Sequence, residues 1–140
     1  MLSLQDRFGL KGSTMPQSKK TLFLSLALAA GFIFFGVQKF GAENIVFETI
    51  AERSGLGFFE PHVRMMTGVA ELLSAVLLLV PKTRLLGALA GTGVLLGAIG
   101  FHLSPWLGIN VPEVGHFLFF VAVAMLILSL VNLNWLRTKA

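Results

Sequence analysis

Four apolar stretches, each long enough to cross a bilayer, account for most of this 140-residue chain. A hydrocarbon core about 30 Å thick requires roughly 20 apolar residues in a helix that rises about 1.5 Å per residue. Hydrophobic residues make up 55% of the chain and charged residues 13%, against about a quarter charged in soluble domains. The sequence therefore predicts an all-α integral membrane four-helix bundle with spans at Thr21–Phe40, His62–Val80, Leu85–Leu103 and Val114–Val131.

The distribution of basic residues predicts the topology. Eight lie before the first span, in the turn after the second span or after the fourth span, and three lie on the other side. Under the positive-inside rule both termini are then cytoplasmic, in a bacterial-type inner membrane. We expect residues 1–20 to form a cytoplasmic tail and residues 21–136 the membrane domain. The basic residues form no single stripe, so nucleic acid is not an expected partner. The chain has no cysteine, so any thiol chemistry belongs to a partner.

The connections between spans differ in length and character. The longest, Ala42–Pro61, contains an amphipathic segment at Glu43–Arg53 that predicts a short helix in the outer interface. The short turn Val80–Arg84 requires the second and third spans to pack as an antiparallel hairpin. Paired glycines at four-residue spacing in the third span favour close helix approach, which predicts that this span is the most enclosed (Gly87 with Gly91, Gly93 with Gly97).

Glu71 lies near the middle of the second span, between apolar residues. A carboxyl at a helix centre costs about 2.5–3.5 kcal/mol on insertion scales, so such residues usually face the bundle interior. We weigh two interpretations. Glu71 binds a ligand or handles protons, or it is a neutral hydrogen-bonded group that joins helices.

Other polar residues fall in the outer half of the membrane with Glu71. Arg64 is seven residues earlier on the same helical face, either as an anchor that snorkels to water or as a cationic wall of a pocket. Gln38 and Lys39 end the first span. Helix rise puts Glu71 about 13 Å below the outer end of its span, so contact with Lys39 would need a longer side chain, a tilt or bridging waters.

His102 ends the third span and His116 begins the fourth, so they are expected to face each other across a short hairpin. Two histidines alone satisfy neither the four ligands of zinc nor a haem motif. We therefore expect a proton relay or a polar pocket wall rather than a haem or metal site, and Glu113 is an alternative hydrogen-bond partner. The site residues predicted from the sequence are Gln38, Lys39, Arg64, Glu71, His102 and His116.

Three segments resemble the DoxX/DoxX-like superfamily: Gly36-Val37-Gln38-Lys39-Phe40, Gly68–Leu73 with its G-x-x-E pattern, and the Pro-basic turn that ends Leu77–Arg84. The resemblance covers roughly residues 21–131. It implies a four-helix inner-membrane bundle in which Lys39 and Glu71 match the family's polar pair. Some members are linked to quinone-dependent thiosulfate oxidation or to redox-stress complexes, and distant animal relatives assist receptor assembly. His102 and His116 are not part of this pattern.

These observations favour an accessory subunit of a membrane redox system, with an outer-side polar pocket for a quinone-like or other small lipophilic ligand. The expected partners are the lipid bilayer and a larger membrane complex or further copies of this chain. One alternative is a non-catalytic assembly subunit. Another is a small-molecule transporter, which the lack of an inverted repeat disfavours. A bound ligand beside Glu71 would favour the ligand-binding interpretation, whereas apolar side chains filling that space would favour the assembly subunit.

Overall fold

The protein is described by a computed structural model that covers the backbone of residues 14–139 and the side chains of residues 19–138. The described residues form four long helices: α2 (Thr14–Gln38), α4 (His62–Leu79), α5 (Arg84–His102) and α6 (Phe117–Lys139). Shorter elements connect them: α3 (Ile45–Ser54) and the 3₁₀ turns η1 (Gly57–Phe59) and η2 (Pro81–Thr83). Within the described residues, four helical segments are long and apolar enough to cross a membrane. The chain is thus an all-α bundle and a multi-pass membrane protein.

The four predicted spans are confirmed, with shifts at their ends. The fourth helix starts three residues later than predicted and continues to Lys139, beyond the predicted end at Val131. The first helix begins at Thr14, inside the predicted tail, and residues 1–13 lie outside the described part of the chain. Helix ends move in this way because polar residues at the membrane boundary still form backbone hydrogen bonds when the helix continues into the interface.

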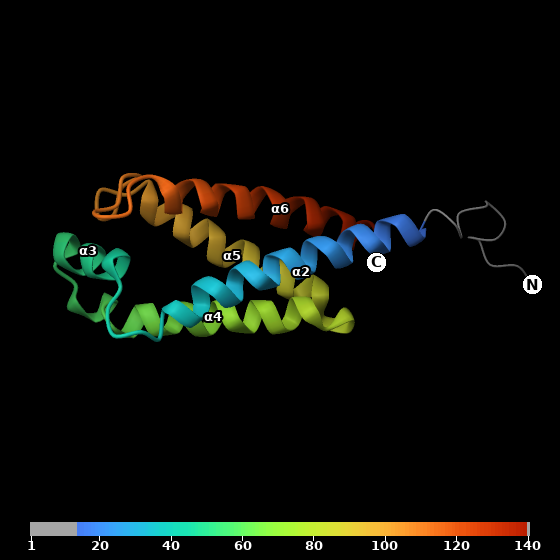
Figure 1. Ribbon diagram of the computed structural model, residues 1–140, viewed down its shortest axis with the longest axis horizontal. Coiled ribbons are helices and arrows are strands. Elements are labelled where there is room, and N and C mark those ends of the chain that lie inside the picture. The colour runs from blue at the N-terminus through green and yellow to red at the C-terminus, as the bar shows by residue number, and fades with distance from the viewer. Residues whose placement is uncertain (1–13, 140) are drawn as a thin grey trace, which may run out of the picture.

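The long helices form a ring in the order α2, α4, α5, α6, so that each contacts its two neighbours. Figure 1 shows α3 and the α5–α6 connection at one end of the bundle, and the start of α2 and the end of α6 at the other. We call these the α3 end and the terminal end. The largest apolar core lies between α2, α4 and α5. Its buried members are Leu28, Ala29, Phe32, Ala75, Leu78, Ala88 and Leu95.

Buried polar side chains join the helices toward the terminal end. Asn132 of α6 donates from its amide nitrogen to the hydroxyl of Ser25 in α2, at 3.1 Å. The hydroxyls of Thr92 in α5 and Ser129 in α6 are 2.8 Å apart. Hydrogen bonds between spans stabilise bundles in lipid, where water cannot compete for the same groups. This network was not predicted from the sequence.

The glycines in the two halves of α5 have different surroundings. A Cβ added at Gly87 would lie 2.6 Å from the backbone nitrogen of Leu78, and one at Gly91 would lie 2.7 Å from the ring of Phe32. A Cβ at Gly93 or Gly97 would have no heavy atom within 4 Å. The prediction of close helix approach is therefore confirmed at Gly87 and Gly91 and is wrong at Gly93 and Gly97. The prediction that α5 is the most enclosed span is also wrong, since the apolar windows of α2, α4 and α5 are equally buried, 33% each.

The short helix α3 forms a roof over the α3 end. Its N-terminus is capped by Asn44, whose side-chain oxygen accepts from the backbone N–H of Val46 and Phe47, which satisfies two otherwise unpaired donors. Phe47 and Ile50 are buried on its inner face. Ile50 packs in a cluster with Phe59, Leu107 and Val111. The predicted short amphipathic helix is therefore present, and its apolar face packs on the end of its own bundle.

Candidate functional site

A cavity of about 430 Å³ lies between the helices toward the α3 end, within the range of about 300–1,000 Å³ usual for small-molecule sites. All four long helices and α3 contribute to its wall. Most of the lining is apolar, with Phe32, Phe35, Val94, Phe101 and Met125 among the larger side chains. Its polar members are Gln38, Lys39, Asn44, Thr67, Glu71 and His102.

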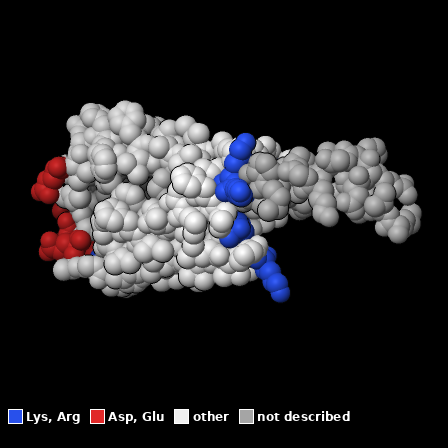
Figure 2. Space-filling view, turned by 45° about the vertical axis from the view of Figure 1, so that its right-hand side comes forward, with Lys and Arg blue, Asp and Glu red and all other residues white. Residues whose placement is uncertain are grey.

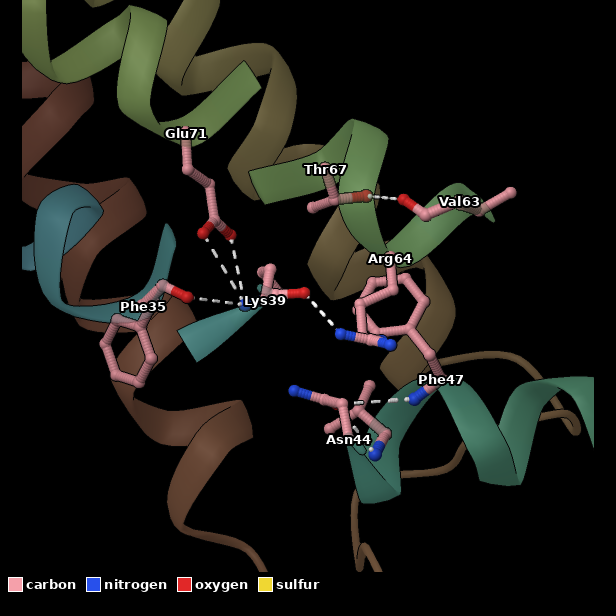
Figure 3. A network of polar contacts seen from close by, with 9 residues as sticks. Phe35, Lys39, Asn44, Phe47, Val63, Arg64, Thr67 and Glu71 are labelled. Carbon is pink, nitrogen blue, oxygen red and sulfur yellow. Dashed lines mark hydrogen bonds and ion pairs between the residues drawn. The ribbon is translucent and has the colours of Figure 1, made fainter. Parts of the chain in front are cut away.

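Lys39 and Glu71 form an ion pair at the wall of this cavity. The Nζ atom of Lys39 lies 3.5 Å from both carboxylate oxygens of Glu71. It also donates to the backbone carbonyl of Phe35 at 3.1 Å, and Figure 3 shows the lysine between these two acceptors. The distances to the carboxylate exceed the 2.7–2.9 Å usual for charge-assisted hydrogen bonds. The pair neutralises two buried charges while it leaves hydrogen-bonding capacity on both groups.

The contact between Lys39 and Glu71 is direct, because α4 extends well beyond the end of α2. A Cβ added at Gly68 would lie 2.7 Å from Cβ of Lys39, so the end of α2 is level with Gly68 and not with the start of α4. Since α4 begins at His62, it extends about 9 Å beyond that level, at 1.5 Å per residue. Glu71 is only three residues further along, within reach of a lysine side chain. Glycine at 36 and 68 allows this approach, because a Cβ at Gly36 would meet Leu72 and Glu71 at 3.1–3.2 Å.

Arg64 is buried, with 2% of its surface exposed, and it is not among the residues that line the cavity. It pairs with Glu60, one turn earlier, at 2.6 Å. It also donates to the carbonyl oxygens of Lys39 and Gly41, and Figure 3 shows it on the far side of Lys39 from Glu71. Neither the snorkelling anchor nor the pocket wall describes this arrangement. Arg64 fixes the end of α2 to α4, and Glu60 is the partner that the sequence analysis missed.

The two histidines do not share an environment. His102 is 5% exposed and lines the cavity. Its Nδ1 lies 2.9 Å from the carbonyl oxygen of Gly108. A carbonyl only accepts, so Nδ1 carries the hydrogen and Nε2 of the neutral ring is left as an acceptor. His116 is exposed, packs on Phe120 and does not line the cavity.

The structure thus brings together four of the six predicted site residues: Gln38, Lys39, Glu71 and His102 line one cavity. The other two, Arg64 and His116, lie outside it. Asn44 and Thr67 also line the cavity, but Asn44 caps α3 and the hydroxyl of Thr67 donates to the carbonyl of Val63 at 2.8 Å. Within the described residues no three His, Cys, Asp or Glu side chains gather to hold a metal ion.

The cavity can therefore accept a ligand with an apolar body and a polar head group. Lys39 offers donors, Glu71 offers acceptors or a proton, His102 offers an acceptor and Gln38 offers both. Comparison with curated proteins and with solved structures gives no match. Residues 23–131, which include most of each of the four spans and every residue of the site, match the family model described as the DoxX-like family. The chain belongs to the DoxX-like family.

Proposed function

We propose that the chain is an accessory subunit of a membrane redox system and that its cavity binds a quinone-like ligand. The observation that supports this is the cavity beside the Lys39–Glu71 pair. A bundle that serves only as an assembly subunit gains stability when apolar side chains fill such a space, because each empty volume forfeits packing contacts. Here two glycines on α5, Gly93 and Gly97, widen the cavity instead.

The polar groups of the cavity suit the two forms of a quinone. Lys39 can donate to a carbonyl oxygen of the oxidised form, and Nε2 of His102 can accept from a hydroxyl of the reduced form. Conversion between the forms takes two electrons and two protons. Glu71 is placed to exchange a proton with the head group. The chain has no cysteine, so a partner protein supplies the electrons in this proposal.

We further propose that the terminal end faces the cytoplasm. Figure 2 shows basic side chains near the terminal end and acidic side chains at the α3 end. The basic residues described at the terminal end are Lys19, Lys20, Lys82, Arg84 and Arg137. At the α3 end Arg64 is paired with Glu60, and Arg53 donates to the carbonyl of Leu107. This asymmetry is the one that the positive-inside rule associates with cytoplasmic termini.

Equilibrium binding of decylubiquinone to the purified protein in lipid nanodiscs tests the ligand. Quinones quench tryptophan fluorescence. The ring centroid of Trp106 lies 6.5 Å from that of Phe101, which lines the cavity. Replacing Trp135 by phenylalanine leaves Trp106 as the single reporter, since the chain has two tryptophans. We expect saturable quenching in this background.

Two pairs of variants make the binding test specific. Gly97→Leu adds a side chain to the cavity and should weaken binding about tenfold or more, because overpacking of the ligand costs about 1–3 kcal/mol. Gly100→Leu is the control, since Gly100 has equally open surroundings and does not line the cavity. Glu71→Gln should bind but lose activity in the intact redox system, whereas Glu71→Leu should lose both. Equal binding by all variants would contradict the proposal.

A further inference from the structure

The helix α2 crosses the bundle diagonally. Toward the terminal end it contacts α6, where Gly31 packs against Met125 and Ser25 bonds with Asn132. Toward the α3 end it contacts α4, where Gly36 packs against Leu72. Figure 1 shows the same course, with α2 beside α6 near the termini and beside α4 near α3. The two helices α2 and α6 therefore diverge along the half of the bundle that holds the cavity.

The other helix pairs are joined where α2 and α6 diverge. Phe59, directly before α4, packs edge-to-face on Phe101 of α5 at 5.6 Å. His102 of α5 packs on Phe119 of α6 at 5.7 Å. Residues from α2 (Phe35, Gln38) and from α6 (Leu118, Val121) line the cavity. Both helices thus contribute to the cavity wall on the side where they diverge.

The α3 end is closed by the roof. Ile50, Phe59, Leu107 and Val111 form one buried cluster across it. The guanidinium of Arg53 donates to the carbonyl of Leu107 at 2.8 Å and so ties α3 to the α5–α6 connection. A ligand that came from the aqueous side would have to separate these contacts.

The charges in the cavity define the head group. Lys39 and Glu71 cancel each other, and both side chains are largely buried, 13% and 10% exposed. A charged head group would leave one net charge in a mostly apolar space, at a cost of several kcal/mol per ion. An uncharged head group with a carbonyl or hydroxyl keeps the pair intact and still reaches Lys39, Glu71 and the free acceptor of His102.

We infer that the ligand is an uncharged amphiphile that enters from the bilayer leaflet at the α3 end, between α2 and α6, and leaves its apolar tail in that opening. This inference rests on the proposed function in that the cavity binds a ligand. It adds the charge class of the ligand and the route by which it arrives.

The association rate of decylubiquinone tests the route by stopped-flow quenching of Trp106. The chain has no cysteine, so one cysteine at Gln38 can be labelled with a bulky maleimide beside the opening. Val37→Cys, labelled in the same way, is the control, because Val37 is also exposed on α2 but does not line the cavity. The label at position 38 should slow association about tenfold, whereas the control stays within about twofold of the unlabelled protein. Arg53→Ala loosens the roof and should leave the rate unchanged.

The possible results distinguish failure of the sideways route from failure of ligand binding itself. Unchanged association with the label at position 38, or faster association in Arg53→Ala, would overturn the sideways route while normal equilibrium binding kept the proposed function. No saturable binding of decylubiquinone would overturn both. Decanoate and decylamine in large excess should fail to displace the bound quinone. Displacement by either one would overturn the assignment of an uncharged head group.

Discussion

Two alanine substitutions on the same helix should have opposite effects on stability. Gly87→Ala and Gly97→Ala each add one methyl group to α5 and gain the same helix propensity, up to about 1 kcal/mol. The difference between the two variants therefore isolates packing. At Gly87 the new Cβ would lie 2.6 Å from the backbone nitrogen of Leu78 and 2.8 Å from the carbonyl carbon of Leu77. At Gly97 it would meet no heavy atom within 4 Å.

The Cβ distances determine the expected difference in stability between the two variants. Carbon contacts are most favourable at about 3.5–4.0 Å, so α4 and α5 would have to separate by about 1 Å at Gly87. Backbone atoms cannot rotate away as a flexible side chain can. Overpacking of this kind costs about 1–3 kcal/mol, which corresponds to a ratio of roughly 5- to 150-fold between the unfolding constants of the two variants.

Equilibrium unfolding by SDS in mixed micelles, followed by circular dichroism, measures this ratio. Gly97→Ala should unfold at the same SDS fraction as the parent protein or at a higher one, and Gly87→Ala at a lower one. If the two variants unfolded together, α4 and α5 would not be in contact at Gly87 and the described hairpin packing would be refuted.

Three further predictions follow from the described contacts. Arg64→Met should destabilise the protein by about 3 kcal/mol or more, because it leaves Glu60 without its ion pair. The double variant with Glu60→Met should recover part of this loss in the same unfolding assay. If it recovered nothing, loss of the ion pair would not be the cause of the destabilisation. Asn132→Leu should lower the free energy of unfolding by no more than about 1 kcal/mol, because the buried Oδ1 of Asn132 has no hydrogen-bond partner among the described residues. A decrease of more than about 3 kcal/mol would show that a bound water or another group forms a hydrogen bond with this oxygen. Lys82 and Glu52 are both exposed, so single cysteines at these positions should react with an impermeant maleimide from opposite sides of the membrane. Spheroplasts and inverted vesicles measure this. Labelling of both positions from the same side would contradict the bundle's orientation across the bilayer.

The sequence by itself determined the four spans, the hairpin between α4 and α5, and the depth of Glu71 in its span. Bilayer thickness fixes how many apolar residues a span needs, so length and composition reveal the helices without knowledge of their neighbours. A carboxyl within an apolar span is also costly in lipid, which indicates an inward position in advance. The resemblance of short motifs then identified Lys39 and Glu71 as a pair.

Only the tertiary structure decided which polar groups meet. Helix faces in a membrane are apolar toward both lipid and protein, so periodicity does not reveal which groups Arg64 pairs with or which glycines of α5 approach a neighbour. The contact between Lys39 and Glu71 depends on how far α4 extends beyond the end of α2, and span lengths alone do not contain that offset. His102 and His116 flank one connection, yet the carbonyl of Gly108 holds the first beside the cavity while the second is exposed. The site arises from these offsets and crossings between helices, which are properties of packing rather than of any single segment.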